Sequence, residues 1–282
     1  MNVLITGGTG FLGRYLIRSA QKLGCHVSVL LRSPCDLSGV RVYRADLVSP
    51  HSEVKEAFRN QDLILHAAVD YRSSERTVAM TESVLKFASS SGNPKIVLVS
   101  SQNASFKNPR GYSLSKRQCE ELLKASYSRW CIVRPTLIYD DDGGFIISGL
   151  VRAARTFHLV PIPGAGTASI QPVHAEDVAE VVARSARIPD GTTLTVAGGE
   201  AVTLRELAEH IQKHFPSTFI FSVPTGLLRL AGTLSPVLHD KVRELEQLKT
   251  LTPEEERELS SVLPGPRRGI LEDLPKLIGL AT

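Results

Sequence analysis

The chain has 282 residues, a length that suits one large α/β domain or a core with a smaller lobe. Hydrophobic residues make up 42% and charged residues 22%, which is the ordinary composition of a soluble globular protein. The net charge of +4 comes from basic residues scattered among acidic ones. This scattered charge argues against a basic surface that binds nucleic acid, and it is compatible with a small anionic ligand.

The spacing of the cysteines and the length of the apolar runs indicate where the protein is found. No cysteine pair has CxxC spacing, which predicts free thiols in a reducing, cytoplasmic environment for Cys25, Cys35, Cys119 and Cys131. A first strand starting at Asn2 leads us to expect no signal peptide before the fold. No apolar run reaches the roughly 18 residues of a membrane span. Arg229 and Pro236 interrupt the apolar stretch 226–238, which favours a packing helix or a pocket wall.

A strand, a glycine turn and a helix are predicted at the start of the chain. The apolar run at Val3 leads into Gly7, Gly10 and Gly13, and an amphipathic run, 11–23, follows at once. Glycine lets the chain reverse, lets a pyrophosphate approach the backbone, and lets the helix sit close to the strand. The free N–H groups and the helix dipole then favour phosphate. The context predicts a dinucleotide site, the alternative being a plain turn.

Short apolar strands alternate with helices over the next hundred residues. We predict strands at 26–32, 41–44, 62–66, 95–101 and 130–134, with helices at about 75–90 and 112–126. This alternation is typical of a parallel sheet with right-handed crossovers. The predicted fold class is therefore α/β, a doubly wound parallel Rossmann-type sheet.

The pattern becomes less regular after about residue 140. Residues 140–144 form a polar break and 161–166 a Pro/Gly loop, whereas 169–173 and 193–196 are expected to return to the sheet. Beyond residue 200 the chain is mainly helical in pattern, with capping boxes at Thr203–Glu206 and Thr252–Glu255. We predict a Rossmann domain at 1–198, with 141–167 contributing to the substrate cleft, and a small, mainly helical substrate lobe at 199–282.

Tyr112 and Lys116 open a predicted helix with the spacing that puts both side chains on one face. A tyrosine alone is a poor acid at neutral pH, since its reference pKa is about 10. A nearby lysine favours the phenolate and can also donate to ribose hydroxyls. The structural alternative is an ordinary solvated helix face.

Two serines end the fifth predicted strand, where ligands of parallel sheets bind. Ser100 or Ser101 could polarise a substrate carbonyl beside the Tyr112 phenol. Either serine could instead cap a strand or turn.

Together these segments resemble the extended short-chain dehydrogenases/reductases of the NAD-dependent epimerase/dehydratase superfamily. The matching segments are Thr6–Gly13, Ala45–Leu47, Leu65–Ala68, Val99–Ser101 with Tyr112 and Lys116, Arg134–Pro135 and Pro172–Ala179. The resemblance covers roughly residues 2–180. It implies that Ser101 orients substrate, that Tyr112 exchanges the proton, and that Lys116 holds the ribose and tunes Tyr112. The cofactor contacts implied are Gly7, Thr9, Gly10, Phe11, Leu12, Gly13, Asp46, Leu47, Ala67, Ala68 and Lys116.

Two departures from the family pattern matter. After the second strand, where many members have an acidic residue, this chain has Arg32. An arginine there favours binding of a 2′-phosphate, so we predict NADP(H) as the cofactor, with Arg14 as a second contact to that phosphate. NAD(H) is the alternative cofactor. The alternative is that Arg32 is an exposed surface residue with no role in cofactor binding. In addition, the segment after Ala68 is short and lacks the family's asparagine near 77–79, which puts the usual support of the active-site loop in doubt.

No metal site is predicted. His174 lacks further ligands at zinc spacing and is interpreted as structural, and Asp140, Asp141 and Asp142 as a solvated turn. Arg152 and Arg155 border the substrate cleft or lie on the surface.

Three functions compete at this point. The first is an NADP(H)-dependent oxidoreductase acting on a carbonyl or secondary alcohol, and the second a nucleotide-sugar epimerase or dehydratase. The third is a non-enzymatic NAD(P)-binding subunit or assembly factor, a class that often loses Tyr or Lys, whereas this chain keeps both. The oxidoreductase is preferred, with a small-molecule substrate of unidentified structure and a homodimer as an open possibility.

Overall fold

The computed structural model describes residues 1–280 apart from Pro34, Asp36, Ser38, Pro50, His51, Gly143 and 227–246. Residues 227–238, nearly all of the apolar stretch 226–238, therefore lie outside the described residues. The chain forms two compact units. The first contains Met1–Pro135, Val178–Val196 and Glu255–Pro264, and the second contains Thr136–Asp177, Ala197–Glu254 and Gly265–Thr282. The predicted functional division into 1–198 and 199–282 stays a prediction.

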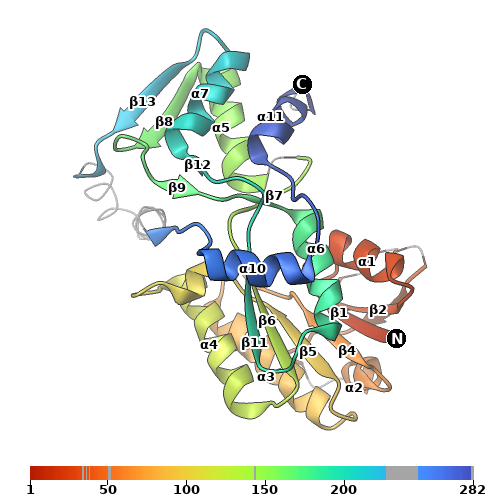
Figure 1. Cartoon of the computed structure of the whole chain (residues 1–282). Helices are drawn as coiled ribbons and strands as arrows, with labels where there is room; N and C mark the ends of the chain where they lie inside the picture. Colours follow the sequence, from red (N-terminus) through yellow and green to blue (C-terminus); the bar gives the residue numbers. More distant parts are fainter. Residues whose placement is uncertain are drawn as a thin grey trace. The chain divides into compact units, whose positions relative to one another are not determined.

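The first unit is built on a seven-stranded sheet in the order β11-β6-β5-β4-β1-β2-β3 (Figure 1). All its neighbouring strands run parallel. The strands are β1 (Asn2–Thr6), β2 (His26–Leu31), β3 (Arg41–Arg44), β4 (Leu63–His66), β5 (Lys95–Val99), β6 (Trp130–Pro135) and β11 (Thr192–Val196). The predicted doubly wound parallel sheet is confirmed. Its strand order reverses between β1 and β4, and ligands of such sheets bind at the carboxyl ends beside that point.

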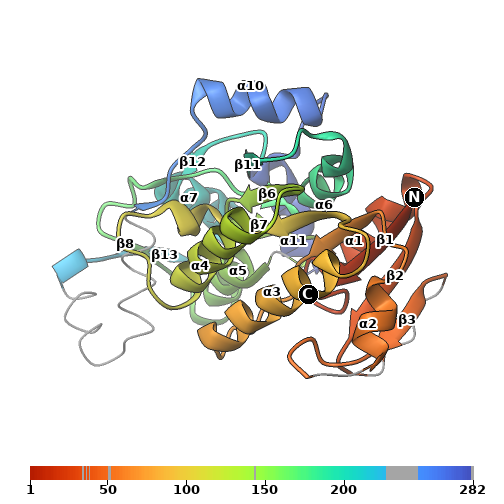
Figure 2. The same ribbon diagram turned by 90° about the horizontal axis from the view of Figure 1, so that it is seen from below.

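Helices cover both faces of this sheet, and Figure 2 shows α3 and α4 together on one side with α6 on the other. The helices of this part are α1 (Gly13–Lys22), α2 (Ser52–Phe58), α3 (Ser74–Ser89), α4 (Gly111–Ser126), α6 (Ala175–Arg184) and α10 (Pro253–Val262), with short 3-10 turns at Gln102–Ser105 and Ser185–Arg187. Buried side chains of α2, α3 and α4 pack on the sheet around Leu4, Ile64, Ile96 and Ile132. This apolar layer fixes α3 and α4 beside the carboxyl ends of β4 and β5.

The second unit has its own apolar core, formed around Tyr139, Val160, Leu207 and Leu274. Its helices are α5 (Gly144–Phe157), α7 (Leu204–His214) and α11 (Ile270–Leu280). Its strands are β7 (Ile138–Tyr139), β8 (Leu159–Pro163), β9 (Ser169–Ile170), β10 (Val173–His174), β12 (Val202–Thr203) and β13 (Phe219–Val223). Thr203 caps α7 through the predicted capping box with Glu206.

Two sequence expectations for this region were wrong. Residues 169–173 do not return to the main sheet, because β9 pairs with β12 and β10 pairs with β7. Residues 161–166 are only partly a loop, because Pro161 and Pro163 lie in β8, which pairs in parallel with β13. A two-stranded sheet tolerates proline, since each strand has one edge that needs no donor. Residues 193–196 lie in β11 at the edge of the main sheet, as expected.

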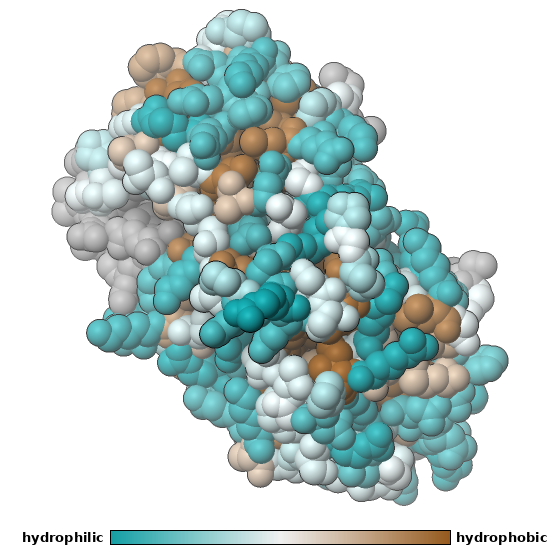
Figure 3. Space-filling view, viewed as in Figure 1, coloured by the Kyte–Doolittle hydropathy of each residue, from teal (hydrophilic) through white to brown (hydrophobic). Residues whose placement is uncertain are grey.

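The displayed face in Figure 3 is mostly hydrophilic, and hydrophobic residues show there only in small separate patches. Among the described residues, none of the helices combines the length and apolar character needed to cross a bilayer.

Candidate active site

The glycine turn after β1 depends on close backbone packing. Gly7 has a φ of +80°, and a Cβ added to it would lie 2.7 Å from the main chain of Ala67 and Ala68 at the end of β4. A Cβ on Gly13 would lie 2.4 Å from the carbonyl oxygens of Gly7 and Gly8. At Gly10 the nearest atom to an added Cβ is the Gly7 oxygen, at 3.2 Å. Gly7 and Gly13 are therefore required by the fold, whereas Gly10 leaves the turn open on its outer side.

The start of α1 has the properties of an anion site. Leu12 occupies the N-cap position, and its apolar side chain makes no cap hydrogen bond to the first turn of the helix. Thr9, Gly10 and Phe11 are exposed, and Leu12 is buried beneath them. Backbone donors and the helix dipole together favour a phosphate at this position. The exposed side of the turn at Gly10, where an added Cβ would meet only the Gly7 oxygen, fits the close approach of a dinucleotide's pyrophosphate.

Two charged residues lie after the neighbouring strands. Arg32 directly follows β2 and is exposed, and no described side chain pairs with its guanidinium. Arg14 lies over the ring of Tyr15, at 5.0 Å from its centroid. Asp46, after β3, forms an ion pair with Arg76 of α3 and accepts a hydrogen bond from the Val48 N–H. Asp46 thus already has a cationic partner, and the buried side chain of Leu47 anchors the same segment.

The end of β4 carries a buried histidine whose partners the sequence did not indicate. His66 lies 2.7 Å from Thr6 Oγ1 through Nδ1 and 3.0 Å from Thr81 Oγ1 through Nε2. Burial, and then the positive charge of Lys116, lower the pKa of His66 to about 3. The ring is therefore neutral at physiological pH and ties β1, β4 and α3 together. The only sequence signal was its place in Leu65–Ala68.

The two serines at the end of β5 have different surroundings. Ser100 is buried and donates to Glu120 Oε1 over 2.5 Å. Arg134 at the end of β6 binds the same carboxylate through Nε at 2.9 Å and Nη2 at 2.5 Å. Ser101 is half-buried, and its Oγ accepts a hydrogen bond from the Asn103 N–H. Of the pair, Ser101 is the serine whose hydroxyl lies outside the buried Glu120 network.

Tyr112 and Lys116 lie in the first two turns of α4, on the face that the i, i+4 spacing predicts. The Lys116 side chain is buried, and its Nζ donates to the Val99 carbonyl oxygen over 2.8 Å. The same Nζ lies 5.8 Å from the centroid of the Tyr112 ring. Burial lowers the pKa of Lys116 to about 8, although the nearby Cys119 and Glu120 oppose that shift. An ammonium held this way keeps donors for a ribose and a charge near the phenol.

The residues weighed for a metal lie in the second unit. Asp140 Oδ1 accepts hydrogen bonds from the N–H groups of Asp142 and Gly144, a capped turn at the start of α5. His174 Nε2 lies 3.4 Å from Asp141 Oδ1, and its Nδ1 accepts from the Glu176 N–H. No group of three potential ligand residues arranged for a metal occurs in the described part of the chain. Arg152 and Arg155 are exposed on α5.

Comparison with known proteins identifies the family of the chain. The family model described as NAD(P)H-binding matches residues 7–189. The chain belongs to this family. A ceramide reductase of Caulobacter vibrioides is 30% identical over 198 residues, 66% of this chain and 61% of that protein. An Arabidopsis thaliana NADH dehydrogenase [ubiquinone] 1 alpha subcomplex subunit 9 is 23% identical over 279 residues, 88% of this chain and 69% of that protein.

Solved structures share the fold over nearly the whole chain. The Escherichia coli NADPH-dependent quinone oxidoreductase QOR2, complexed with NADPH, has a TM-score of 0.78 and 21% identity, covering 98% of this chain and 99% of its own. The Thermus thermophilus UDP-glucose 4-epimerase with NAD has a TM-score of 0.72 and 20% identity, covering 100% and 99%. The NAD(P)-binding fold that the resemblance implies is thereby confirmed. The first of these two structures contains NADPH and the second contains NAD.

Proposed function

We propose that the chain is an NADP(H)-dependent oxidoreductase that transfers a hydride to or from a carbonyl or secondary-alcohol substrate. Its catalytic residues are Ser101, Tyr112 and Lys116. A nicotinamide cofactor bound in this site would supply or accept the hydride. Tyr112 gives the substrate oxygen its proton in reduction and takes it back in oxidation, and Ser101 donates a hydrogen bond to the same oxygen.

One observation carries this proposal: Lys116 is buried, bound to the Val99 oxygen at 2.8 Å, and 5.8 Å from the ring of Tyr112. A buried ammonium without a functional partner would destabilise the fold, since burial disfavours the charged form. Next to a phenol it favours the phenolate, which makes proton exchange easier. The reductases among the relatives and structural neighbours support an oxidoreductase.

The cofactor preference rests on Arg32. Its guanidinium is exposed after β2, at the position where the family often has a carboxylate for the ribose hydroxyl. A guanidinium donates two parallel hydrogen bonds to a phosphate. The Gly7–Gly13 turn would hold the pyrophosphate, and Lys116 the nicotinamide ribose.

A non-enzymatic role is the second candidate, because the Arabidopsis relative is named as a subunit of NADH dehydrogenase. An epimerase or dehydratase would use the same tyrosine and lysine, and the Thermus neighbour has that activity. A cytoplasmic location and a homodimer remain predictions from the sequence.

Tyr112→Phe tests the proposal, with aldehydes, ketones and secondary alcohols screened against both cofactors. The variant keeps the ring, so we expect turnover to fall by roughly 10²–10⁴-fold with cofactor affinity nearly unchanged. Full turnover in this variant would contradict the proposed role of Tyr112 in proton transfer. Tight cofactor binding, failure of the whole screen and a stable protein partner in a pull-down would favour the subunit role.

A further inference from the structure

An exposed tyrosine from another part of the chain lies on the ring of Tyr112. The rings of Tyr71 and Tyr112 are stacked, with 5.4 Å between their centroids and 26° between their planes. Tyr71 is 78% exposed, the highest exposure among the large hydrophobic side chains of the described residues. A side chain so exposed contributes little to the core, so its stacking on Tyr112 needs another explanation.

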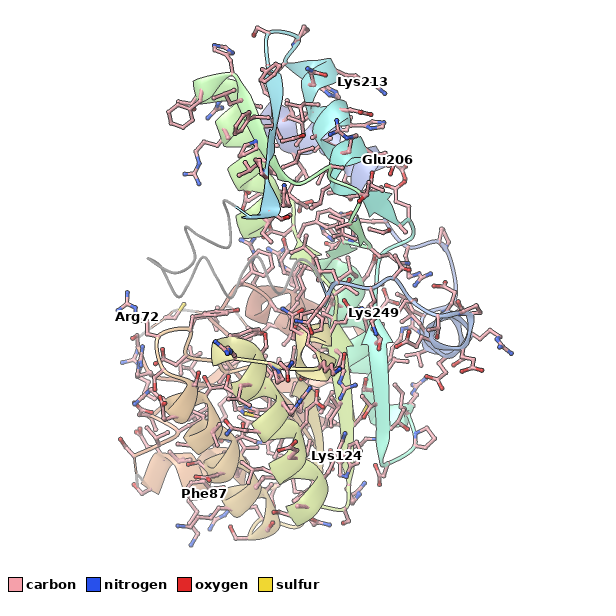
Figure 4. The ribbon with its side chains drawn as sticks, turned by 90° about the vertical axis from the view of Figure 1, so that its left-hand side faces the viewer. Arg72, Phe87, Lys124, Glu206, Lys213 and Lys249 are labelled. Atoms are coloured by element: carbon pink, nitrogen blue, oxygen red, sulfur yellow. The ribbon has the colours of Figure 1, made fainter. Side chains whose placement is uncertain are left out.

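The backbone on both sides of Tyr71 is held by the start of α3. The Asp70 N–H donates to Thr77 Oγ1 at 3.0 Å, and the Asp70 carboxylate accepts from the Arg72 N–H at 2.9 Å. Arg76 Nε lies 3.5 Å from the other Asp70 oxygen, and Ser73 caps α3. Arg72 itself points outward at the edge of this segment (Figure 4). These bonds fix the turn, so Tyr71 reaches Tyr112 from a rigid support.

This turn belongs to the short segment after Ala68, and the missing family asparagine falls near 77–79, within α3. Because α3 and α4 pack side by side, the turn before α3 that carries Tyr71 lies close to the first turn of α4 that carries Tyr112. The stack supplies contact on one side of the Tyr112 ring, and Lys116 lies on the same helix one turn further along.

We propose that Tyr71 is a positioning residue of the reaction site: its ring holds the Tyr112 ring in the orientation that presents the phenol to substrate. The inference rests on the proposed function of Tyr112. Aromatic pairs prefer offset-stacked arrangements at this separation, which restricts rotation of Tyr112 about its side-chain bonds. Small misplacements of a catalytic group have large effects on turnover.

The test compares Tyr71→Ala, Tyr71→Leu and Tyr71→Phe in the full chain, with Leu23→Ala as the control. Leu23 is also an exposed apolar residue, 46% exposed, and it lies at the C-cap of α1, outside the segments assigned to cofactor or substrate. We expect Tyr71→Ala and Tyr71→Leu to lower kcat by about tenfold or more, with KM for the cofactor within about twofold. Tyr71→Phe should keep wild-type kcat, because it keeps the stacked ring, and Leu23→Ala should have no effect.

A second measurement needs no substrate. Tetranitromethane nitrates accessible tyrosine rings, and mass spectrometry of peptides reports Tyr112 separately from Tyr71. Nitration of Tyr112 should be several-fold faster in Tyr71→Ala than in wild type, and unchanged in Tyr71→Phe. Unchanged kcat and unchanged nitration in Tyr71→Ala would overturn the inference, as would loss of kcat in Tyr71→Phe equal to that in Tyr71→Ala. If Tyr112→Phe is fully active, the proposed function fails instead, and nitration alone then decides whether Tyr71 holds the ring.

Discussion

The ammonium of Lys116 and the carbonyl oxygen of Val99 are joined by a hydrogen bond of 2.8 Å. This bond connects the second turn of α4 to the last residue of β5, two residues before Ser101. One contact therefore fixes the lysine, the helix that carries Tyr112, and the strand end that carries the serine. The predictions below separate residues that act in chemistry from those that only support this arrangement.

Gly10 and Gly13 should respond differently to alanine. Gly10→Ala should leave the protein folded but weaken dinucleotide binding by about tenfold or more, equal to about 1.4 kcal/mol, because the methyl lies where the pyrophosphate approaches. Gly13→Ala should destabilise the fold by roughly 1–3 kcal/mol, since its Cβ would lie 2.4 Å from two carbonyl oxygens. Calorimetry and thermal unfolding measure the two effects. Unchanged dinucleotide affinity in Gly10→Ala would contradict a pyrophosphate site at this turn.

Arg32→Asp should reverse the cofactor preference. Loss of charge-assisted hydrogen bonds to the 2′-phosphate costs roughly 1.5–3 kcal/mol, and the new carboxylate repels it. The ratio of the dissociation constants for NADP(H) and NAD(H) is the measurement. Arg18→Asp on α1 is the control, because Arg18 is also exposed and the change in net charge is the same. Equal binding of both cofactors by wild type would make Arg32 a surface residue.

Alanine substitution should have different effects at the two serines, on turnover at Ser101 and on stability at Ser100. Ser101→Ala should lower kcat and cost less stability than Ser100→Ala, because its half-buried hydroxyl lies outside the Glu120 network and caps a short 3-10 turn through the Asn103 N–H. Ser100→Ala should lower the free energy of unfolding by about 1–3 kcal/mol, because it deletes a buried 2.5 Å hydrogen bond to Glu120. Chemical denaturation and steady-state kinetics on the same samples check both. The opposite pattern would assign the active role to Ser100.

His66 should make the fold sensitive to acid. Burial, helped by Lys116, lowers its folded pKa from 6.5 to about 3, so between these values the unfolded chain binds more protons than the folded one. Stability from this group is therefore complete above pH 6.5 and is lost as pH falls toward 3, by about 1.4 kcal/mol per pH unit. The free energy of unfolding at pH 7.5, 6 and 5 measures the slope.

His66→Gln should unfold with a shallower dependence on pH over the same range, because glutamine does not titrate. Identical slopes in wild type and variant would show that His66 is not held neutral by the fold.

Local patterns in the sequence determined the sheet, the glycine turn and the Tyr112–Lys116 pair. These features are readable because each depends on residues close in sequence: an apolar strand beside glycines, or two side chains one helical turn apart. The same argument explains the errors at 161–166 and 169–173. The prolines and glycines of 161–166 indicate a loop and hide β8, and β9 is only two residues long, so local pattern does not show that these strands pair with β13 and β12.

Contacts between distant residues were decided only by the tertiary structure. Tyr71 and Tyr112 are 41 residues apart, and His66 reaches Thr6 across 60. Local pattern does not separate Ser100 from Ser101, and only the position of Glu120 on α4 assigns Ser100 to the buried network. Periodicity states which face of an element is apolar, whereas the pairing of two polar groups depends on how the elements pack. The sequence thus determines the cofactor fold, and packing determines which side chains meet at its site.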